Sequence, residues 1–351
     1  MRPMIRPVTR SKRAGAFCFI LLCVPTLVAQ TSGADPLPSW NEGTSKEAIV
    51  EFVGRVTQAG SSDFVKPEDR IATFDNDGTL WSEQPMYVEL AFTFDRVKQL
   101  APKHPEWQMQ QPFAAVLHHD MKAVAASGDR GVIELFMATH SGMTTDEFNK
   151  IVNDWITQAK HPRFHRLYTE CVFQPMLELL AYLRENGFKT YIVSGGEQEF
   201  MRPWAQRVYG IPPERVIGTM FKMQFTTVEG VPGLERLAAV DSIDDGPGKP
   251  VNIQRFIGKR PIAAFGNSDG DLQMLEWTTA GKGARLGLLV HHTDAVREYR
   301  YDRESSMGKL DKGLIEATTG HWTVVDTAKD WKVMFPPTST APETGANHLP
   351  K

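Results

Sequence analysis

Cysteine is scarce in this chain of 351 residues, which contains only Cys18, Cys23 and Cys171. The first two lie in an N-terminal apolar stretch that we expect to be removed, and a single cysteine cannot form an intramolecular disulfide. We expect Cys171 to be a small buried apolar residue rather than a nucleophile. The sequence also lacks paired histidine or cysteine ligands at zinc spacing. A disulfide-stapled fold is therefore excluded.

The chain also lacks a strong excess of charge of one sign. Its 39 Lys and Arg residues nearly balance its 42 Asp and Glu residues, which gives a formal net charge of −3. No long basic stripe follows the first residues, so we expect no nucleic-acid partner. Hydrophobic residues make up 41% of the chain, which is enough for the core of one or two domains.

The apolar run near the N-terminus is too short for a comfortable transmembrane span. Basic residues precede this run at 14–28, and small residues follow it, which is the layout of a secretory signal peptide. We expect residues 1–34 to be signal peptide and lead-in, with cleavage near Ala29 or Ala34. The alternative is an uncleaved membrane anchor. The cleaved protein would be periplasmic or secreted, without membrane contact.

Short apolar runs typical of strands alternate with helical patterns along much of the chain. This alternation predicts an α/β fold with a doubly wound, mostly parallel sheet. The expected strands are 71–74, 190–193, 216–225, 261–265 and 284–290, and the expected helices are 45–56, 176–186, 197–209, 251–257 and 271–278.

One long helical block interrupts the alternation directly after the first strand. Apolar residues at helical spacing predict helices at 87–100, 113–126, 132–139 and 145–159. We interpret residues 81–170 as an inserted helical cap on a core formed by 35–80 and 171–335. The proline-rich segment 336–351 is expected to be a disordered tail.

Polar side chains follow several of the predicted strands, and ligands bind at the carboxyl ends of such strands. Asp75 and Asp77 end the first strand, and Ser194, Asn267 and His291 end later ones. Two acids at the end of a buried strand are costly unless something compensates them. A metal ion and a phosphate-handling role would explain the pair.

The order of these segments resembles the haloacid dehalogenase-like hydrolase superfamily, on its phosphatase side and in its phosphoserine-phosphatase-like branch. The resemblance extends from Ile71 to about Leu275 and includes a helical insert between the first two motifs. The matching segments are Asp75-Asn76-Asp77-Gly78-Thr79, then Ser194, then Lys249, and finally Gly266-Asn267-Ser268-Asp269-Gly270-Asp271.

The resemblance implies a role for each of the catalytic residues. Asp75 attacks phosphorus and forms an aspartyl-phosphate. Asp77 protonates the leaving group and then deprotonates the attacking water. Ser194 hydrogen bonds a phosphoryl oxygen, and Lys249 neutralises the phosphoryl group and Asp75. Asp77 favours a phosphatase or a phosphomutase over a dehalogenase, because the dehalogenases of the superfamily lack this acid.

The expected cofactor is Mg²⁺, because carboxylate and carbonyl oxygens are the ligands that this ion prefers. The resemblance assigns it to the Asp75 side chain, the Asp77 carbonyl, Asn267 and Asp271, with Asp269 in support. The sequence departs from the family pattern at Asn267, where an acid is usual. This departure motivates a second interpretation, a non-catalytic protein that binds phosphate or an organophosphate.

The expected partner is a small phosphate ester, because a helical cap restricts access to small molecules. We expect Thr79, Gly195 and Gly196 to contact the phosphoryl group, and Glu83 is a candidate to bind a substrate amine. Most histidines of the predicted cap are expected to be surface or packing residues, since they lack paired spacing: His118, His119, His140, His161 and His165.

Overall fold

The computed structural model describes residue 4 and residues 34–228 and 230–338. The predicted signal peptide, up to residue 33, and the end of the predicted tail lie outside these residues. The chain divides into two units, Met1–Asp35 and Pro36–Lys351, and every element below belongs to the second. In the part of the chain that is described, no helix combines the length and apolarity needed to cross a membrane.

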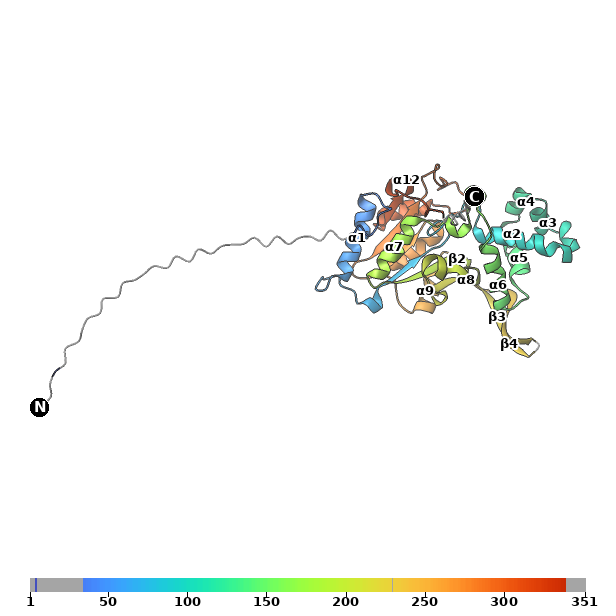
Figure 1. Cartoon of the computed structure of the whole chain (residues 1–351), viewed down its shortest axis with the longest axis horizontal. Coiled ribbons are helices and arrows are strands. Elements are labelled where there is room, and N and C mark those ends of the chain that lie inside the picture. Colours follow the sequence, from blue (N-terminus) through green and yellow to red (C-terminus); the bar gives the residue numbers. More distant parts are fainter. Residues whose placement is uncertain (1–3, 5–33, 229, 339–351) are drawn as a thin grey trace, which may run out of the picture. The chain divides into compact units, whose positions relative to one another are not determined.

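Within the described residues, seven strands form one sheet in the order β4-β3-β2-β1-β5-β6-β7. Figure 1 labels β2, β3 and β4 on one side of this sheet. All neighbouring strands are parallel except β3 and β4, which pair antiparallel. This arrangement confirms the predicted α/β fold with a mostly parallel sheet. The strands are β1 (Ile71–Phe74), β2 (Lys189–Glu197), β3 (Val216–Val228), β4 (Val231–Ser242), β5 (Ala263–Gly266), β6 (Leu286–His291) and β7 (Thr323–Asp326).

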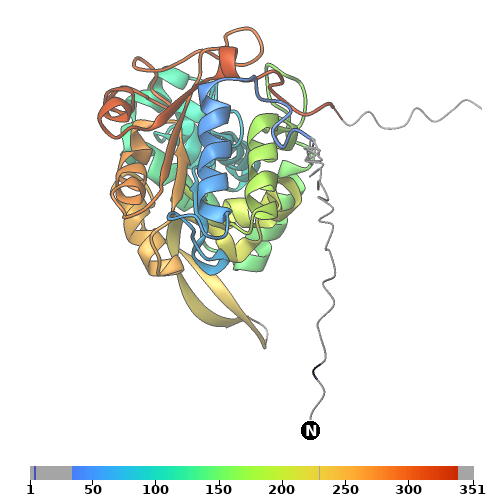
Figure 2. The ribbon, with the colours of Figure 1, turned by 90° about the vertical axis from the view of Figure 1, so that its left-hand side faces the viewer.

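Helices cover both faces of the sheet. Successive side chains of a strand point to opposite faces, so each strand contributes to the core on both sides. Phe74 and Phe265 stack at 4.3 Å in the hydrophobic cluster on one face, whereas Val193 and Ala264 belong to the cluster on the other. Figure 2 shows α1 in blue and α7 in green over the first face. Helices α1 (Thr44–Thr57), α7 (Gln174–Glu185) and α8 (Gln198–Tyr209) contribute to the first cluster, and α9 (Gly248–Ile257), α10 (Leu272–Thr279) and α11 (Lys312–Thr319) to the second.

The helices between residues 88 and 140 share a hydrophobic cluster of their own, which includes Leu90, Phe94 and Leu135. Helix α6 differs, because its buried Phe148 and Val152 belong to the cluster on the sheet. The predicted helix at 113–126 is two helices, with a break where His119 takes a positive φ of 58°. The elements are α2 (Val88–Leu100), α3 (Phe113–Leu117), α4 (Met121–Ala126), α5 (Gly128–His140) and α6 (Thr145–Ile156).

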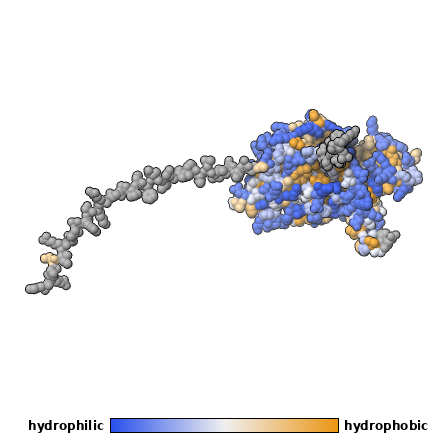
Figure 3. Space-filling view, viewed as in Figure 1, coloured by the Kyte–Doolittle hydropathy of each residue, from blue (hydrophilic) through white to orange (hydrophobic). Residues whose placement is uncertain are grey.

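The sequence patterns missed the C-terminal elements β7, α11 and α12 (Thr327–Asp330), and also strand β4. Pro232 and Gly233 follow Val231 at the start of β4, and both are residue types that strands disfavour. Together, β3 and β4 form a hairpin that projects from the rest of the unit. The hairpin exposes the apolar side chains of Phe225, Val231 and Leu234. Figure 3 shows hydrophobic surface, coloured orange, on this projection.

Candidate active site

Three predicted site residues meet at the carboxyl ends of the central strands, because the strands that precede them are in register. Phe74 of β1 lies opposite Ile192 of β2 and opposite Phe265 of β5. Asp75 directly follows Phe74, and Ser194 and Asn267 lie two residues beyond its partners. The carboxyl ends of the central strands therefore place these side chains at the position where ligands bind in doubly wound folds.

Lys249 lies at the centre of the site, in the first turn of α9 and only 2% exposed. Its Nζ donates hydrogen bonds to Asp75 Oδ1 at 2.7 Å, to Asp271 Oδ1 at 2.6 Å and to the Val193 carbonyl at 3.0 Å. Burial alone would lower the pKa of Lys249, but the charges of Asp271 and Asp75 outweigh it and raise this pKa. The ammonium group therefore stays charged and holds Asp75 in place.

Asp77 lies beside Ser194 at the entrance of the site. A Cβ atom on Gly196 would lie 3.6 Å from Ser194 Oγ and 3.7 Å from Asp77 Oδ2, so both oxygens border the space that this glycine leaves open. Asp77 Oδ1 accepts a hydrogen bond from Trp81 Nε1 at 2.9 Å. Burial raises the pKa of Asp77 to about 6, against the lowering effect of that hydrogen bond. A carboxyl group with this pKa exchanges a proton readily near neutral pH.

Asn267 is fixed between a hydroxyl donor and a carboxylate acceptor. Its Oδ1 accepts from Thr79 Oγ1 at 3.0 Å, and its Nδ2 donates to Glu83 Oε1 at 2.7 Å. The same Glu83 oxygen accepts from the Tyr301 hydroxyl at 2.8 Å. Burial raises the pKa of Glu83, and the charge of Asp77 raises it further. The structure therefore places Glu83, our candidate for a substrate amine, against Asn267 of the fourth motif.

The turn at Gly78 allows this close approach of Asn267 and Glu83. Gly78 has a φ of +74°, which favours glycine, and a Cβ there would lie 2.1 Å from Asn267 Nδ2 and 2.4 Å from Glu83 Oε1. Its carbonyl accepts a hydrogen bond from His292 Nε2 at 2.7 Å. The histidine at the end of β6 that touches the site is therefore His292, whereas the predicted His291 lies beside Asp302.

Asp271 shapes the loop of the fourth motif. One of its oxygens accepts from Lys249, and the other accepts from the backbone N–H groups of Asn267 and Ser268 at 3.0 and 3.1 Å. Asp269 lies further away and accepts from the backbone N–H groups of Asp311 and Gly313 at the start of α11. The contacts of Asp271 are those of a residue that positions Lys249, and its predicted role as a direct or water-mediated metal ligand stays a prediction.

The oxygens at the end of β1 fit a hard divalent cation. Among the described residues, neither Asp75 Oδ2 nor the Asp77 carbonyl accepts a hydrogen bond, and Asn267 Oδ1 accepts one only from Thr79. Several carboxyl groups with one ammonium group leave excess negative charge in a buried site, which a cation would compensate. These carboxyl groups belong to Asp75, Asp77, Glu83 and Asp271.

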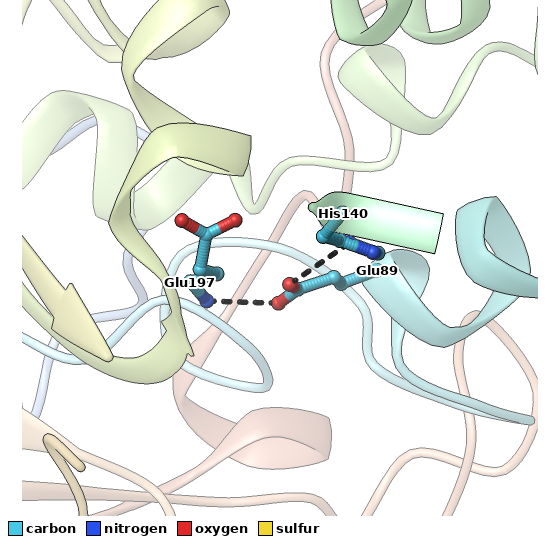
Figure 4. Close-up of side chains that lie close together, drawn as sticks. All are labelled: Glu89, His140 and Glu197. Atoms are coloured by element: carbon cyan, nitrogen blue, oxygen red, sulfur yellow. Dashed lines mark hydrogen bonds and ion pairs between the residues drawn. The ribbon is translucent and has the colours of Figure 1, made fainter. Parts of the chain in front are cut away.

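Sequence reasoning missed a second cluster next to this site, formed by Glu89, His140 and Glu197 (Figure 4), with Arg236 bonded to Glu197. Burial raises the pKa of Glu89 to about 8 and that of Glu197 to about 7, and it lowers the pKa of His140. The residues come from four separate elements. Their spacing in the sequence therefore carries no signal that could have revealed the cluster.

The sheet topology and the acids that follow β1 define an α/β protein with a candidate site at the carboxyl ends of its central parallel strands. A family model described as haloacid dehalogenase-like hydrolase matches residues 72–276, which is more than half of the chain. The chain therefore belongs to that family, which confirms the resemblance seen in the sequence.

Several solved structures are similar to this chain at low sequence identity. A conserved protein of unknown function from Anaerococcus prevotii DSM 20548 is 15% identical, has a TM-score of 0.50, and aligns over 74% of this chain and 88% of its own. A protein of unknown function from Bordetella pertussis Tohama I is also 15% identical, with a TM-score of 0.45 over 73% of this chain and 98% of its own. A phosphoserine phosphohydrolase-like protein from Francisella tularensis is 17% identical, with a TM-score of 0.35 over 63% and 87%. A comparison with curated proteins gave no match.

Proposed function

We propose that the protein is a Mg²⁺-dependent phosphomonoesterase that hydrolyses small organic phosphates through a covalent intermediate on Asp75. One observation carries this proposal: Asp75 ends β1 with one oxygen held by Lys249 at 2.7 Å and the other free of hydrogen bonds from the described residues. An oriented carboxylate with one free oxygen is suited to attack phosphorus. Asp77 and Ser194 border the space where the substrate would lie.

The reaction would proceed in two displacements at phosphorus. In the first, an Asp75 oxygen bonds to phosphorus, the ester P–O bond breaks, and the leaving oxygen takes a proton from Asp77. In the second, water bonds to phosphorus while Asp77 takes its proton. The bond between phosphorus and the Asp75 oxygen then breaks and releases inorganic phosphate. Lys249 and Ser194 would stabilise the charge on the phosphoryl oxygens throughout.

Asp75, the Asp77 carbonyl and Asn267 would hold the magnesium ion. When bound, the ion neutralises the phosphoryl oxygens and orients them for attack. Asn267 supplies an amide oxygen but no charge, and the buried Glu83 lies 2.7 Å from its amide nitrogen. A carboxyl group therefore lies next to the position where the fourth motif lacks its acid. This contact favours a catalytic site over the alternative of a degenerate phosphate-binding protein.

The inserted helices and the N-terminus add two further parts to the proposal. We infer that residues 81–170 act as the cap that limits substrates to small esters. The separate hydrophobic cluster of α2 to α5 supports this role for those helices. We also propose that the protein is exported and acts in the periplasm or outside the cell, on the basis of its N-terminal sequence.

The test is hydrolysis of 4-nitrophenyl phosphate with and without Mg²⁺, measured as released phosphate. Asp75→Asn should lower kcat by at least about a thousandfold, since it removes the nucleophile. Asp69→Asn is the matched control, because Asp69 is exposed and pairs only with Lys259. It should retain activity within about twofold, as expected for a surface substitution. Full activity of Asp75→Asn would contradict the mechanism, and isomerised sugar phosphate in place of free phosphate would indicate a phosphomutase.

A further inference from the structure

The buried cluster beside the catalytic site combines the side chains that bind transition metals. Glu89 in the first turn of α2, His140 at the end of α5 and Glu197 at the end of β2 each present one ligand atom within 4.8 Å of the others. Figure 4 shows the Glu89 carboxylate between His140 and the Glu197 backbone. We propose that these three residues bind a divalent transition-metal ion of the zinc type, separate from the ion at Asp75.

The hydrogen bonds of His140 leave a lone pair directed toward Glu89. Thr139 Oγ1 donates to the Leu135 carbonyl at 2.8 Å, so its oxygen accepts the contact with His140 Nδ1 at 2.7 Å. Nδ1 therefore carries the hydrogen, and Nε2 presents a lone pair. This is the tautomer of a metal-bound histidine whose other nitrogen donates to a neighbouring group.

The lone pair on His140 Nε2 faces Glu89 Oε1, and no hydrogen bond joins these two atoms. His140 Nε2 lies 3.6 Å from Glu89 Oε1, and neither atom has a hydrogen-bond partner among the described residues, although His140 is 0% and Glu89 6% exposed. The separation is too long for a hydrogen bond. Two ligand atoms about 2.1 Å from a tetrahedral zinc ion would lie about 3.4 Å apart. The observed spacing therefore matches a pair of ligands better than a proton bridge.

The other contacts of the cluster hold the ligands in place. Glu89 Oε2 accepts the Glu197 N–H at 2.9 Å. Both oxygens of Glu197 accept from Arg236, at 3.0 and 2.8 Å, and Arg236 also donates to the His140 carbonyl. The Arg236 guanidinium lies 4.0 Å from the Phe148 ring centroid. Such supporting contacts orient metal ligands and exclude water around them.

The charges and atom types of the cluster determine which ion fits. Among the described residues, the Arg236 guanidinium donates to the Glu197 carboxylate and not to that of Glu89, so a bound cation would supply Glu89 with a positive partner. An imidazole nitrogen favours zinc and its neighbours among transition metals over Mg²⁺, which prefers oxygen ligands only. The chemistry therefore predicts a different ion from the one at Asp75.

The cluster lies close enough to influence the catalytic loop. A Cβ on Gly196 would lie 3.1 Å from Glu89 Oε2 and 3.6 Å from Ser194 Oγ, so a single glycine separates the cluster from the phosphate-binding serine. A bound ion would join α2 and α5 to Glu197 at the end of β2. It would therefore fix the inserted helices close to Ser194, the residue proposed to contact the phosphoryl group.

Zinc uptake should be measured in the Asp75→Asn protein, whose motif site is impaired. We expect one zinc ion per chain by elemental analysis after dialysis against Zn²⁺. We also expect Tm to rise on the order of 5 °C when zinc is present at about 100 times its Kd. Adding Glu89→Gln should remove both effects. The amide group that this substitution introduces would donate to His140 Nε2, which keeps the metal-free protein folded, and circular dichroism would verify the fold.

The matched control is Glu106→Gln in the same background, because Glu106 pairs with His104 at 3.1 Å but both are exposed. This control should bind zinc as the parent does. The proposal is wrong if the parent binds no zinc, or if the Glu89→Gln protein retains the same zinc content and Tm shift. Co²⁺ supplies a test that needs no change in the cluster: four-coordinate binding gives intense visible absorption. Weak, six-coordinate absorption would overturn the proposal.

Discussion

The contact between Asn267 and Glu83 can be tested by exchanging the two functional groups. In Asn267→Asp, the Nδ2 that donates to Glu83 Oε1 at 2.7 Å becomes an oxygen. A hydrogen bond to a charged group contributes about 1.5–3 kcal/mol, and its loss leaves two carboxyl groups in contact. Coulomb repulsion at this distance and an effective dielectric constant of about 20 is about 6 kcal/mol before relaxation or proton uptake. We expect Asn267→Asp to lower the free energy of unfolding by about 2–5 kcal/mol without metal.

The partner substitution should reverse this loss. In Glu83→Gln alone, an amide oxygen still accepts from Asn267 and Tyr301, so the free energy of unfolding should change by less than about 1 kcal/mol. In the double variant, the amide introduced at position 83 donates to the carboxylate introduced at position 267, and the Tyr301 hydroxyl accepts or donates as required. The double variant should therefore be at least about 2 kcal/mol more stable than Asn267→Asp.

Urea unfolding in the presence of EDTA, followed by tryptophan fluorescence, gives the free energy of unfolding of the parent, the two single variants and the double variant. The expected order of stability places the parent and Glu83→Gln together, the double variant just below them, and Asn267→Asp well below. If the effects of the two substitutions are additive, Glu83 does not contact Asn267 as described. The account of a carboxyl group next to the position where the fourth motif lacks its acid would then be wrong.

Three further predictions concern single positions. Gly78→Ala should lower the free energy of unfolding, measured by thermal unfolding, by at least about 2 kcal/mol and by more than Gly60→Ala does. Both glycines have a positive φ, but only a Cβ at Gly78 would meet neighbouring atoms. Equal losses in the two variants would contradict the close packing at Gly78. Burial lowers the pKa of His161, so below about pH 6.5 the unfolded state takes up the proton first. The free energy of unfolding of the parent, measured in urea titrations relative to that of His161→Gln, should then fall by up to about 1.4 kcal/mol for each unit by which the pH is lowered. A difference between the two proteins that does not change with pH would refute this prediction. Burial raises the pKa of the Cys171 thiol to about 12, so iodoacetamide should modify the native protein at about pH 8 far more slowly than the unfolded one. Rapid alkylation of the native protein, seen by mass spectrometry, would contradict that burial.

The sequence predicted those parts of the fold and site that depend on local patterns. The strand at Ile71–Phe74 was predicted at its observed bounds, because a short apolar run ends abruptly in Asp75. The helix expected at 251–257 is present as α9, and Lys249 lies in its first turn because α9 begins at Gly248. Neighbouring parallel strands bring their carboxyl ends together, so motifs at those ends converge whatever the loops between them do.

The remaining features depend on tertiary contacts that local patterns do not encode. Strand β4 contains Pro232 and Gly233 directly after its first residue, Val231, and the antiparallel pairing with β3 stabilises it despite these residues. The position of Glu83 depends on the turn at Gly78, and Tyr301 reaches it from more than two hundred residues away. The approach of Glu89 to His140 likewise depends on how α2 and α5 pack.

Trapping the covalent intermediate tests the central claim most directly. The enzyme would be mixed with 4-nitrophenyl phosphate and Mg²⁺, quenched with acid and treated with borohydride, which reduces an aspartyl-phosphate to homoserine. Peptide mass spectrometry should then find homoserine at position 75, and none in the Asp75→Asn protein treated in the same way. Homoserine at another aspartate, or turnover without modification at Asp75, would contradict the assignment of Asp75 as the nucleophile.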